Sequence, residues 1–260
     1  MTIVVGIGSP DGLILASDSR TTLTRDGYHH IGTDVADKLF ILEDAEGVAR
    51  YGVATYGWAL IGKRTIKGLI DEYIASCGRT VAVPADVFEL AASLANFFQD
   101  RFVEEYGEHV PDEKWAVCFI LAGYDDLGIG HLLEIKIPGP MVMRMNNTPD
   151  RGLLMRGQTW VLTRLIKGVD RAALDHAEIE FAPGVEGQLA NLAYPVEPPV
   201  ALQDAADMAT FLVRTTIDMQ RFFSAATLSK RAPGCGGAIQ MIAVTRAGAT
   251  WLARRSLSGP

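Results

Sequence analysis

The chain has 260 residues, of which 48% are hydrophobic and 21% are charged, and its formal net charge is −7. This length and balance predict one compact domain with a single large core. The acidic balance and the lack of clustered lysine or arginine argue against nucleic acid or an anionic membrane as a partner, because both favour a basic surface.

The sequence also indicates where the protein works. It contains no uninterrupted apolar stretch of the roughly 20 residues that a membrane helix needs. Glycines, a proline and an aspartate break the apolar start of the chain, and no basic residue precedes it, so it does not resemble a signal peptide. Cys77, Cys118 and Cys235 are too irregularly spaced for a disulfide framework or a zinc site. We expect a soluble cytoplasmic protein with no metal or other cofactor.

The first part of the chain reads as strands followed by helices. Apolar runs at residues 3–7 and 13–16, joined by a Pro-Asp-Gly turn, predict a hairpin. Residues 38–42 and 48–55 predict two more strands. Apolar residues then recur at steps of three and four, which predicts a helix over residues 59–76 and another from Pro84 to about Tyr106.

The second part repeats that order. Strands are predicted at residues 115–124, 131–137 and 141–145, helices at 159–174 and 202–223, and final strands at 238–245 and 250–257. Such segregation of strands and helices is typical of the α+β class. It suggests two sheets packed face to face with a helical layer outside each, a four-layer αββα sandwich, although periodicity alone does not separate this from other α+β arrangements.

The residue with the clearest chemical potential is Thr2, which directly follows Met1. If Met1 is removed, Thr2 carries a hydroxyl nucleophile and a free amine that can serve as its own general base. An unperturbed α-amine has a pKa of about 7.7 to 8.0, so it can accept a proton near neutral pH. No histidine is required for such a site.

Two further features give Thr2 a context. The run Asp-Gly-Leu-Ile-Leu-Ala-Ser-Asp-Ser-Arg ends in Asp18, Ser19 and Arg20, and Lys38 heads a later strand. With Thr2, these features resemble proteasome β subunits, and more closely the Anbu-type bacterial proteasome-related proteins, which also begin Met-Thr. The pair Gly236 and Gly237 before an apolar strand matches as well.

This resemblance implies the fold and activity of an N-terminal nucleophile hydrolase. The implied fold is the αββα sandwich with two antiparallel sheets, formed by residues 1–260 as one domain. The implied activity is a threonine peptidase that cleaves peptide or protein substrates through an acyl-enzyme on Thr2, within a homo-oligomeric ring or helical assembly.

The resemblance also assigns roles around Thr2. The Lys38 ammonium would lower the pKa of the amine, and Asp18 would pair with Lys38 and orient it. Arg20 could close the same network. Gly57, at the junction of a strand and the first long helix, would supply the oxyanion donor, with Gly52 as the competing candidate.

The sequence departs from the proteasome pattern near its C-terminus. Gln158 follows Gly157 where the family has a serine, Cys235 stands for a second serine, and Ala232 stands where an aspartate is expected. Gln158 can still hydrogen-bond the amine and Cys235 is a weak donor. These departures keep two alternatives open: a non-catalytic assembly subunit of the same fold, or an amidohydrolase that acts on non-peptide amides.

Overall fold

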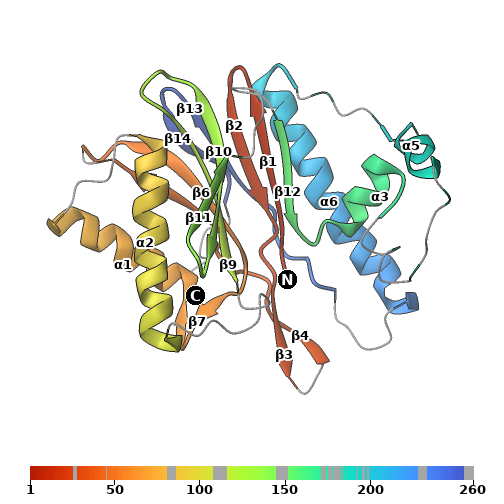
Figure 1. The fold of residues 1–260 in the computed structure, drawn as a ribbon, viewed down its shortest axis with the longest axis horizontal. Helices are drawn as coiled ribbons and strands as arrows, with labels where there is room; N and C mark the ends of the chain where they lie inside the picture. The colour runs from red at the N-terminus through yellow and green to blue at the C-terminus, as the bar shows by residue number, and fades with distance from the viewer. Residues whose placement is uncertain are drawn as a thin grey trace, which may run out of the picture.

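The computed structural model describes residues 1–25, 28–44, 46–80, 86–107, 116–144, 152–170, 184–191, 199–227 and 233–254, together with residues 174, 178, 182, 193, 194 and 197. Two five-stranded antiparallel sheets lie face to face (Figure 1). The first sheet has the order β12 (Gly152–Gly157), β1 (Ile3–Ser9), β2 (Gly12–Ser17), β13 (Gln240–Thr245) and β14 (Gly248–Ala253). The second has the order β11 (Met141–Arg144), β10 (Gly130–Ile137), β9 (Val117–Tyr124), β6 (Ala49–Gly57) and β5 (Leu39–Glu43).

Alternation along the strands of the first sheet supplies apolar residues to both of its faces. In β1, Val4 packs into the core between the sheets, whereas Ile3, Val5 and Ile7 pack on the opposite face. The inter-sheet core is formed by side chains from both sheets, among them Val4, Leu13, Leu15, Ala54, Ile120, Leu132 and Ile242.

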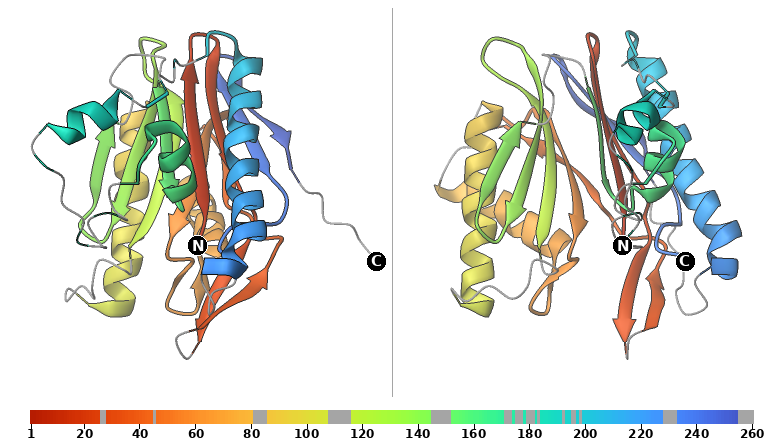
Figure 2. Two further views of the ribbon diagram at one scale, coloured as in Figure 1. Left: turned by 90° about the vertical axis from the view of Figure 1, so that its right-hand side faces the viewer. Right: turned by 45° about the vertical axis from the view of Figure 1, so that its right-hand side comes forward.

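Helices cover the outer face of each sheet (Figures 1 and 2). The helix α6 (Leu202–Thr227), with α3 (Trp160–Lys167) beside it, lies on the first sheet, where its apolar stripe meets the outward residues of β1 and β2. The helices α1 (Ile66–Thr80) and α2 (Val87–Tyr106) lie on the second sheet and bury a cluster that includes Phe98 and Phe119. The predicted α+β class is therefore confirmed.

Short elements join these layers. The hairpin of β3 (Thr21–Arg25) and β4 (Tyr28–Thr33) projects from the end of the molecule at which the N-terminus lies (Figure 1). A smaller hairpin, β7 (Leu60–Ile61) with β8 (Arg64–Thr65), precedes α1, and α5 (Val185–Ala190) is a short helix before α6. In the described part of the chain, every helix is too short or too polar to cross a membrane.

The structure corrects several predicted boundaries. The first long helix does not begin at Ala59, because residues 60–65 form the β7–β8 hairpin and Thr65 Oγ1 accepts the amide of Gly68 at 3.1 Å at the start of α1. The helix predicted over 159–174 is α3, which ends at Lys167 before Gly168 adopts a left-handed φ of 72°.

Besides the strands of the β7–β8 hairpin, the strands β3, β4 and β12 were not predicted. Several predicted ends, Pro84, Trp115, Met145 and Leu257, lie outside the described residues. The other predicted strands and helices are confirmed, with ends that differ by a few residues.

Candidate active site

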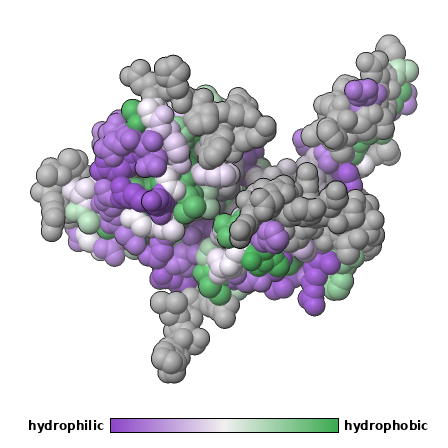
Figure 3. Space-filling view, turned by 90° about the horizontal axis from the view of Figure 1, so that it is seen from below, coloured by the Kyte–Doolittle hydropathy of each residue, from purple (hydrophilic) through white to green (hydrophobic). Residues whose placement is uncertain are grey.

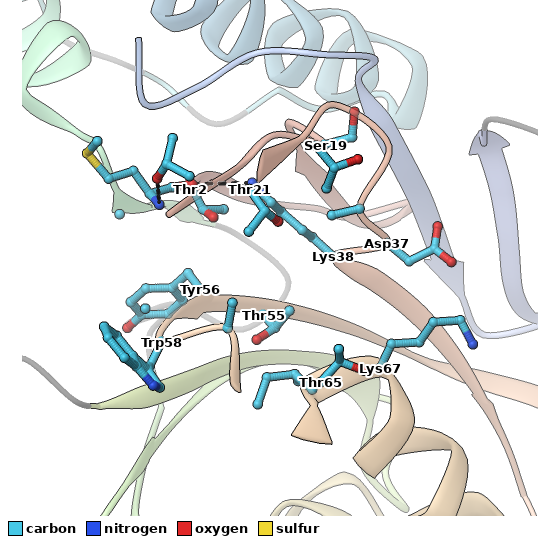
Figure 4. A pocket seen from close by; sticks show the side chains of 18 of the residues that line it. Thr2, Ser19, Thr21, Asp37, Lys38, Thr55, Tyr56, Trp58, Thr65 and Lys67 are labelled. Atoms are coloured by element: carbon cyan, nitrogen blue, oxygen red, sulfur yellow. Dashed lines mark hydrogen bonds between the residues drawn. The ribbon is translucent and has the colours of Figure 1, made fainter. Parts of the chain in front are cut away.

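A pocket of about 1590 Å³ lies beside Thr2. One wall carries Thr2, Ser19, Thr21 and Lys38, and the facing wall carries Thr55, Tyr56 and Trp58 (Figure 4). Figure 3 shows the end of the molecule at which the N-terminus lies. Most of the surface on the side of α1 and α2 is hydrophilic in this view. Of the residues singled out from the sequence, Thr2, Lys38, Gly57 and Gln158 line the pocket.

Asp18 lies just after β2, is fully buried, and has both carboxylate oxygens saturated by donors. Oδ1 accepts from Lys38 Nζ at 2.8 Å and from the Ile3 amide at 3.1 Å. Oδ2 accepts from the Gly236 amide at 2.9 Å and from the Arg20 amide at 3.2 Å. Four donors hold this carboxylate in one orientation, so it fixes the ammonium of Lys38.

Lys38 lies just before β5 and extends towards the start of the chain. Its Nζ is 3.5 Å from the carbonyl oxygen of Met1, which belongs to the peptide bond that joins Met1 to Thr2. Its backbone amide donates to Gln240 Oε1 at 3.0 Å, and its carbonyl accepts from the Thr55 amide at 2.9 Å. These contacts place an ammonium beside the backbone of Thr2, a residue that is only 7% exposed.

The N-terminal amine lies in the same environment. The Met1 amine donates to Thr22 Oγ1 at 2.8 Å. Burial lowers the pKa of this amine below its ordinary value, and the positive charge of Lys38 lowers it further, against the opposing negative charge of Asp18. The Met1 amine therefore loses its proton more readily than a solvated amine does.

The two glycines considered for the oxyanion donor occupy different environments. Gly57 ends β6 and lines the pocket, with a left-handed φ of 85°. A Cβ at Gly57 would lie 2.4 Å from the carbonyl oxygen of Ala116, so only glycine fits. Gly52 instead packs within the core between the sheets, against Leu15, Ile242 and Val244.

Gly157 and Gln158, at the end of β12, contact the backbone carbonyl of Thr2. The Gln158 amide donates to the carbonyl oxygen of Thr2 at 2.7 Å. Gly157 has a φ of 83°, and a Cβ there would lie 2.0 Å from that same oxygen. The backbone of this segment thus positions Thr2, a role that the sequence had not indicated.

The guanidinium of Arg20 does not close the network of Asp18 and Lys38. It binds Asp34 through two bonds, Nε to Oδ1 at 2.6 Å and Nη2 to Oδ2 at 2.9 Å, and donates to the Pro233 carbonyl at 3.2 Å. The hydrogen bond with Asp34, with a smaller opposing effect of burial, raises the pKa of Arg20. Arg20 reaches Asp18 only through its backbone amide.

Cys235 is buried beneath the site, at 1% exposure. Its amide donates to Gln220 Oε1 at 2.9 Å, and Gln220 Nε2 approaches its Sγ at 3.7 Å. Burial first, and then the charge of Asp18, raise the pKa of this thiol far above its ordinary value. Cys235 is therefore a neutral thiol held by α6, and Ala232 lies outside the described residues.

Sequence reasoning missed four supporting residues: Asp34, Gln220, Gly236 as a donor to Asp18, and Gln240. Each lies far along the chain from its partner or in a segment read as a loop, so no local pattern marks it. Among the described residues, no three histidine, cysteine, aspartate or glutamate side chains lie together in a way that could hold a metal ion.

Known structures share this architecture. No protein-family model matches the chain, and no curated protein matches it in sequence. Among solved structures, an Anbu Gly-1 mutant from Hyphomicrobium sp. strain MC1 aligns with 100% of this chain and 88% of its own, at 14% identity and a TM-score of 0.62.

Two more solved structures give the same result. The Anbu complex from Pseudomonas aeruginosa, described as a helical assembly, covers 98% of this chain and 88% of its own at 19% identity and a TM-score of 0.61. Anbu from Yersinia bercovieri, described as an ancestral β-subunit, covers 96% and 86% at 14% identity and a TM-score of 0.59. At these identities the likeness establishes the fold: the chain has the fold of the Anbu proteins, which confirms the resemblance found in its sequence.

Proposed function

We propose that this chain is a proteasome-like threonine peptidase that forms an acyl-enzyme on Thr2 once Met1 is removed. The observation that carries the proposal is the position of Lys38, whose ammonium is bound to Asp18 at 2.8 Å and lies 3.5 Å from the carbonyl of the Met1–Thr2 peptide bond, at the wall of a large pocket. The layered helices and sheets fit the αββα sandwich of N-terminal nucleophile hydrolases.

The proposed reaction uses the groups of Thr2 itself. Thr2 Oγ1 attacks the substrate carbonyl while the Thr2 amine accepts the hydroxyl proton. That proton passes to the leaving nitrogen as the C–N bond breaks, which leaves an ester on Thr2. Water then hydrolyses the ester and restores the hydroxyl and the amine. The ion pair with Asp18 holds the Lys38 ammonium in place, and its positive charge favours the neutral amine and the developing negative charge on oxygen.

Gly57 is the proposed oxyanion donor. Its place in the pocket wall, its left-handed backbone and its lack of a side chain let a substrate carbonyl approach the backbone closely. The position of Gly52 in the inter-sheet core favours Gly57 over it.

We propose further that the chain acts as a homo-oligomer in the cytoplasm. The helical assembly described for the Pseudomonas aeruginosa complex supports a ring or helical arrangement of this fold. Three unpaired, buried cysteines suit a reducing compartment.

A non-catalytic assembly subunit remains the competing function, because Cys235 offers only a buried neutral thiol where the proteasome pattern has a hydroxyl. Intact mass spectrometry and peptide hydrolysis distinguish the two functions. A peptidase is expected to lack Met1, to cleave fluorogenic peptides, and to form a covalent adduct with a peptide β-lactone on Thr2.

The matched variants are Thr2→Ala, which removes the nucleophile, and Thr2→Ser, which keeps it. Thr2→Ala is expected to abolish hydrolysis and the adduct without changing the assembly measured by light scattering, whereas Thr2→Ser retains measurable hydrolysis. Retained Met1 and no turnover would establish the assembly subunit, and Thr2-dependent turnover of acyl amides alone would establish the non-peptide amidohydrolase.

A further inference from the structure

A second polar cluster lies between the two sheets and is formed by the buried Glu134 and the partly buried Tyr56 and Arg156. Arg156 binds both oxygens of Glu134, with Nε to Oε1 at 2.6 Å and Nη2 to Oε2 at 2.9 Å. Tyr56 donates its hydroxyl to Glu134 Oε1. Glu134 is 5% exposed, so its charge is compensated inside the protein rather than by solvent.

The cluster joins strands from different sheets. Arg156 belongs to β12 of the first sheet, whereas Glu134 belongs to β10 and Tyr56 to β6 of the second. Most of the contact between the sheets is apolar and sets no particular distance or register, whereas a two-pronged ion pair fixes both.

Each end of the cluster leads to one wall of the pocket. On β12, Arg156 is followed by Gly157 and then by Gln158, whose amide holds the Thr2 carbonyl at 2.7 Å. On β6, Tyr56 itself lines the pocket and is followed by Gly57 and Trp58, which line it as well. The nucleophile wall and the facing wall are therefore connected through three side chains.

A buried ion pair is a poor source of stability, because desolvation offsets most of its attraction, but it can specify one geometry. Burial acts to raise the pKa of Glu134, yet the hydrogen bonds from Arg156 and Tyr56 bring it below its ordinary value. The carboxylate thus stays charged and keeps both partners bound at neutral pH.

We propose that Glu134 is a positioning residue that, through Arg156 and Tyr56, sets the separation of Thr2 from Gly57 across the pocket. This inference rests on the proposed function, in which those two residues must contact the same substrate carbonyl. Reaction rates depend steeply on such a separation, since a displacement of about 1 Å can lower the rate about 100-fold.

The test compares Glu134→Gln and Tyr56→Phe with Tyr73→Phe. Tyr73 is a matched control, because it is a buried tyrosine, and its hydroxyl donates to Ser93 at 2.9 Å in the layer of α1 and α2, away from the pocket. Active sites are counted by titration with the β-lactone, so that kcat refers to correctly folded molecules.

Glu134→Gln is expected to lower kcat per titrated site by about tenfold or more with KM within about twofold, because chemistry is impaired and binding is not. Arg156→Lys keeps the positive charge but cannot bind both oxygens of Glu134 as a planar guanidinium does. Its kcat per titrated site is expected to lie between the values of wild type and Arg156→Met. Tyr73→Phe is expected to have the same kcat per titrated site as wild type. Wild-type kcat per site in both Glu134→Gln and Tyr56→Phe would overturn the proposal, and Tyr56→Phe alone decides it where Glu134→Gln does not fold.

A second measurement does not depend on hydrolysis. Loss of the cluster is expected to accelerate hydrogen exchange of the Gln158 amide at least tenfold in Tyr56→Phe or Glu134→Gln, with no change in Tyr73→Phe. Unchanged exchange would refute the positioning role. A wild-type protein without turnover but with this exchange difference would instead refute the proposed function alone.

Discussion

The ammonium of Lys38 lies 2.8 Å from Oδ1 of Asp18, and the two side chains are only 6% and 0% exposed. An ion pair so well shielded from water is neither screened by salt nor easily replaced by hydration. Removal of either partner therefore affects both the stability of the fold and the chemistry beside Thr2.

We expect Lys38→Met to abolish hydrolysis and to lower the free energy of unfolding by about 3 kcal/mol, because it leaves Asp18 charged and buried with only backbone donors. Urea unfolding with a fluorogenic peptide assay measures both effects. Lys63→Met is the control, since Lys63 is exposed on the turn between β7 and β8. Equal stability of the two variants would contradict the role of the ion pair.

The pH dependence of kcat/KM is expected to follow the N-terminal amine. Burial, and then the charge of Lys38, lower the pKa of the Met1 amine from its ordinary value of 8.0. We expect the same two causes to act on the Thr2 amine that removal of Met1 exposes, and only a neutral amine accepts a proton. Activity should therefore rise with pH along a limb whose midpoint lies below pH 8. The rate of N-terminal acetylation at different pH values gives the same midpoint independently. A midpoint at or above pH 8 would show that the pKa of the amine is not lowered.

Gly57→Ala is expected to lower kcat by about tenfold or more, because its Cβ would displace the end of β6 from Ala116. The control is Gly47→Ala, where φ is similarly positive at 77° but no atom lies within 4 Å. Both variants share a backbone cost of about 1 kcal/mol, so a difference between them reports on the pocket wall. Equal activity of the two would remove Gly57 from the site.

Gly157→Ala is expected to displace Thr2, since the added Cβ would meet its carbonyl oxygen at 2.0 Å. The fraction of molecules acylated on Thr2 by the β-lactone should fall sharply. Gly107→Ala, at the end of α2, has a φ of 74° and no atom within 4 Å, and should acylate like wild type. Full acylation of Gly157→Ala would mean that this segment does not position the nucleophile.

The buried thiol of Cys235 is expected to resist alkylation in the native protein, because burial raises its pKa and hides it from reagents. Cys235→Ala should retain hydrolysis within about threefold of wild type, in contrast to Thr2→Ala. Rapid alkylation of native Cys235 that also stops turnover would indicate a thiol nucleophile instead.

The comparison of sequence with structure shows which signals are local. Asp18 could be identified because it lies in a short motif, and Lys38 could be identified because it heads a predicted strand. The strand β12 could not, because its charged Arg156 breaks an apolar pattern, and the reason for that charge, Glu134, lies in the other sheet. The hairpin of β3 and β4 was missed for a similar reason, since its apolar residues Leu23 and Ile31 are exposed and do not form the buried face that periodicity detects.

The same distinction holds within the candidate site. Arg20 follows Asp18 closely in sequence, which suggested a shared network, but its side chain binds Asp34 in a segment that had no pattern of its own. Gln220 lies on α6 and accepts the amide of Cys235, and the Gly236 amide donates to Asp18, which lies 218 residues earlier in the chain. Contacts between segments about 200 residues apart leave no trace in local composition.

The carboxylate of Asp18 binds donors from residues 3, 20, 38 and 236, so the two ends of the chain must meet before it is complete. A ribosome-bound chain that has not yet exposed Gly236 carries Thr2 but lacks the finished anchor for Lys38. In the proposed enzyme, cleavage would therefore begin only after the segment that carries Gly236 has been synthesised and has packed against Asp18.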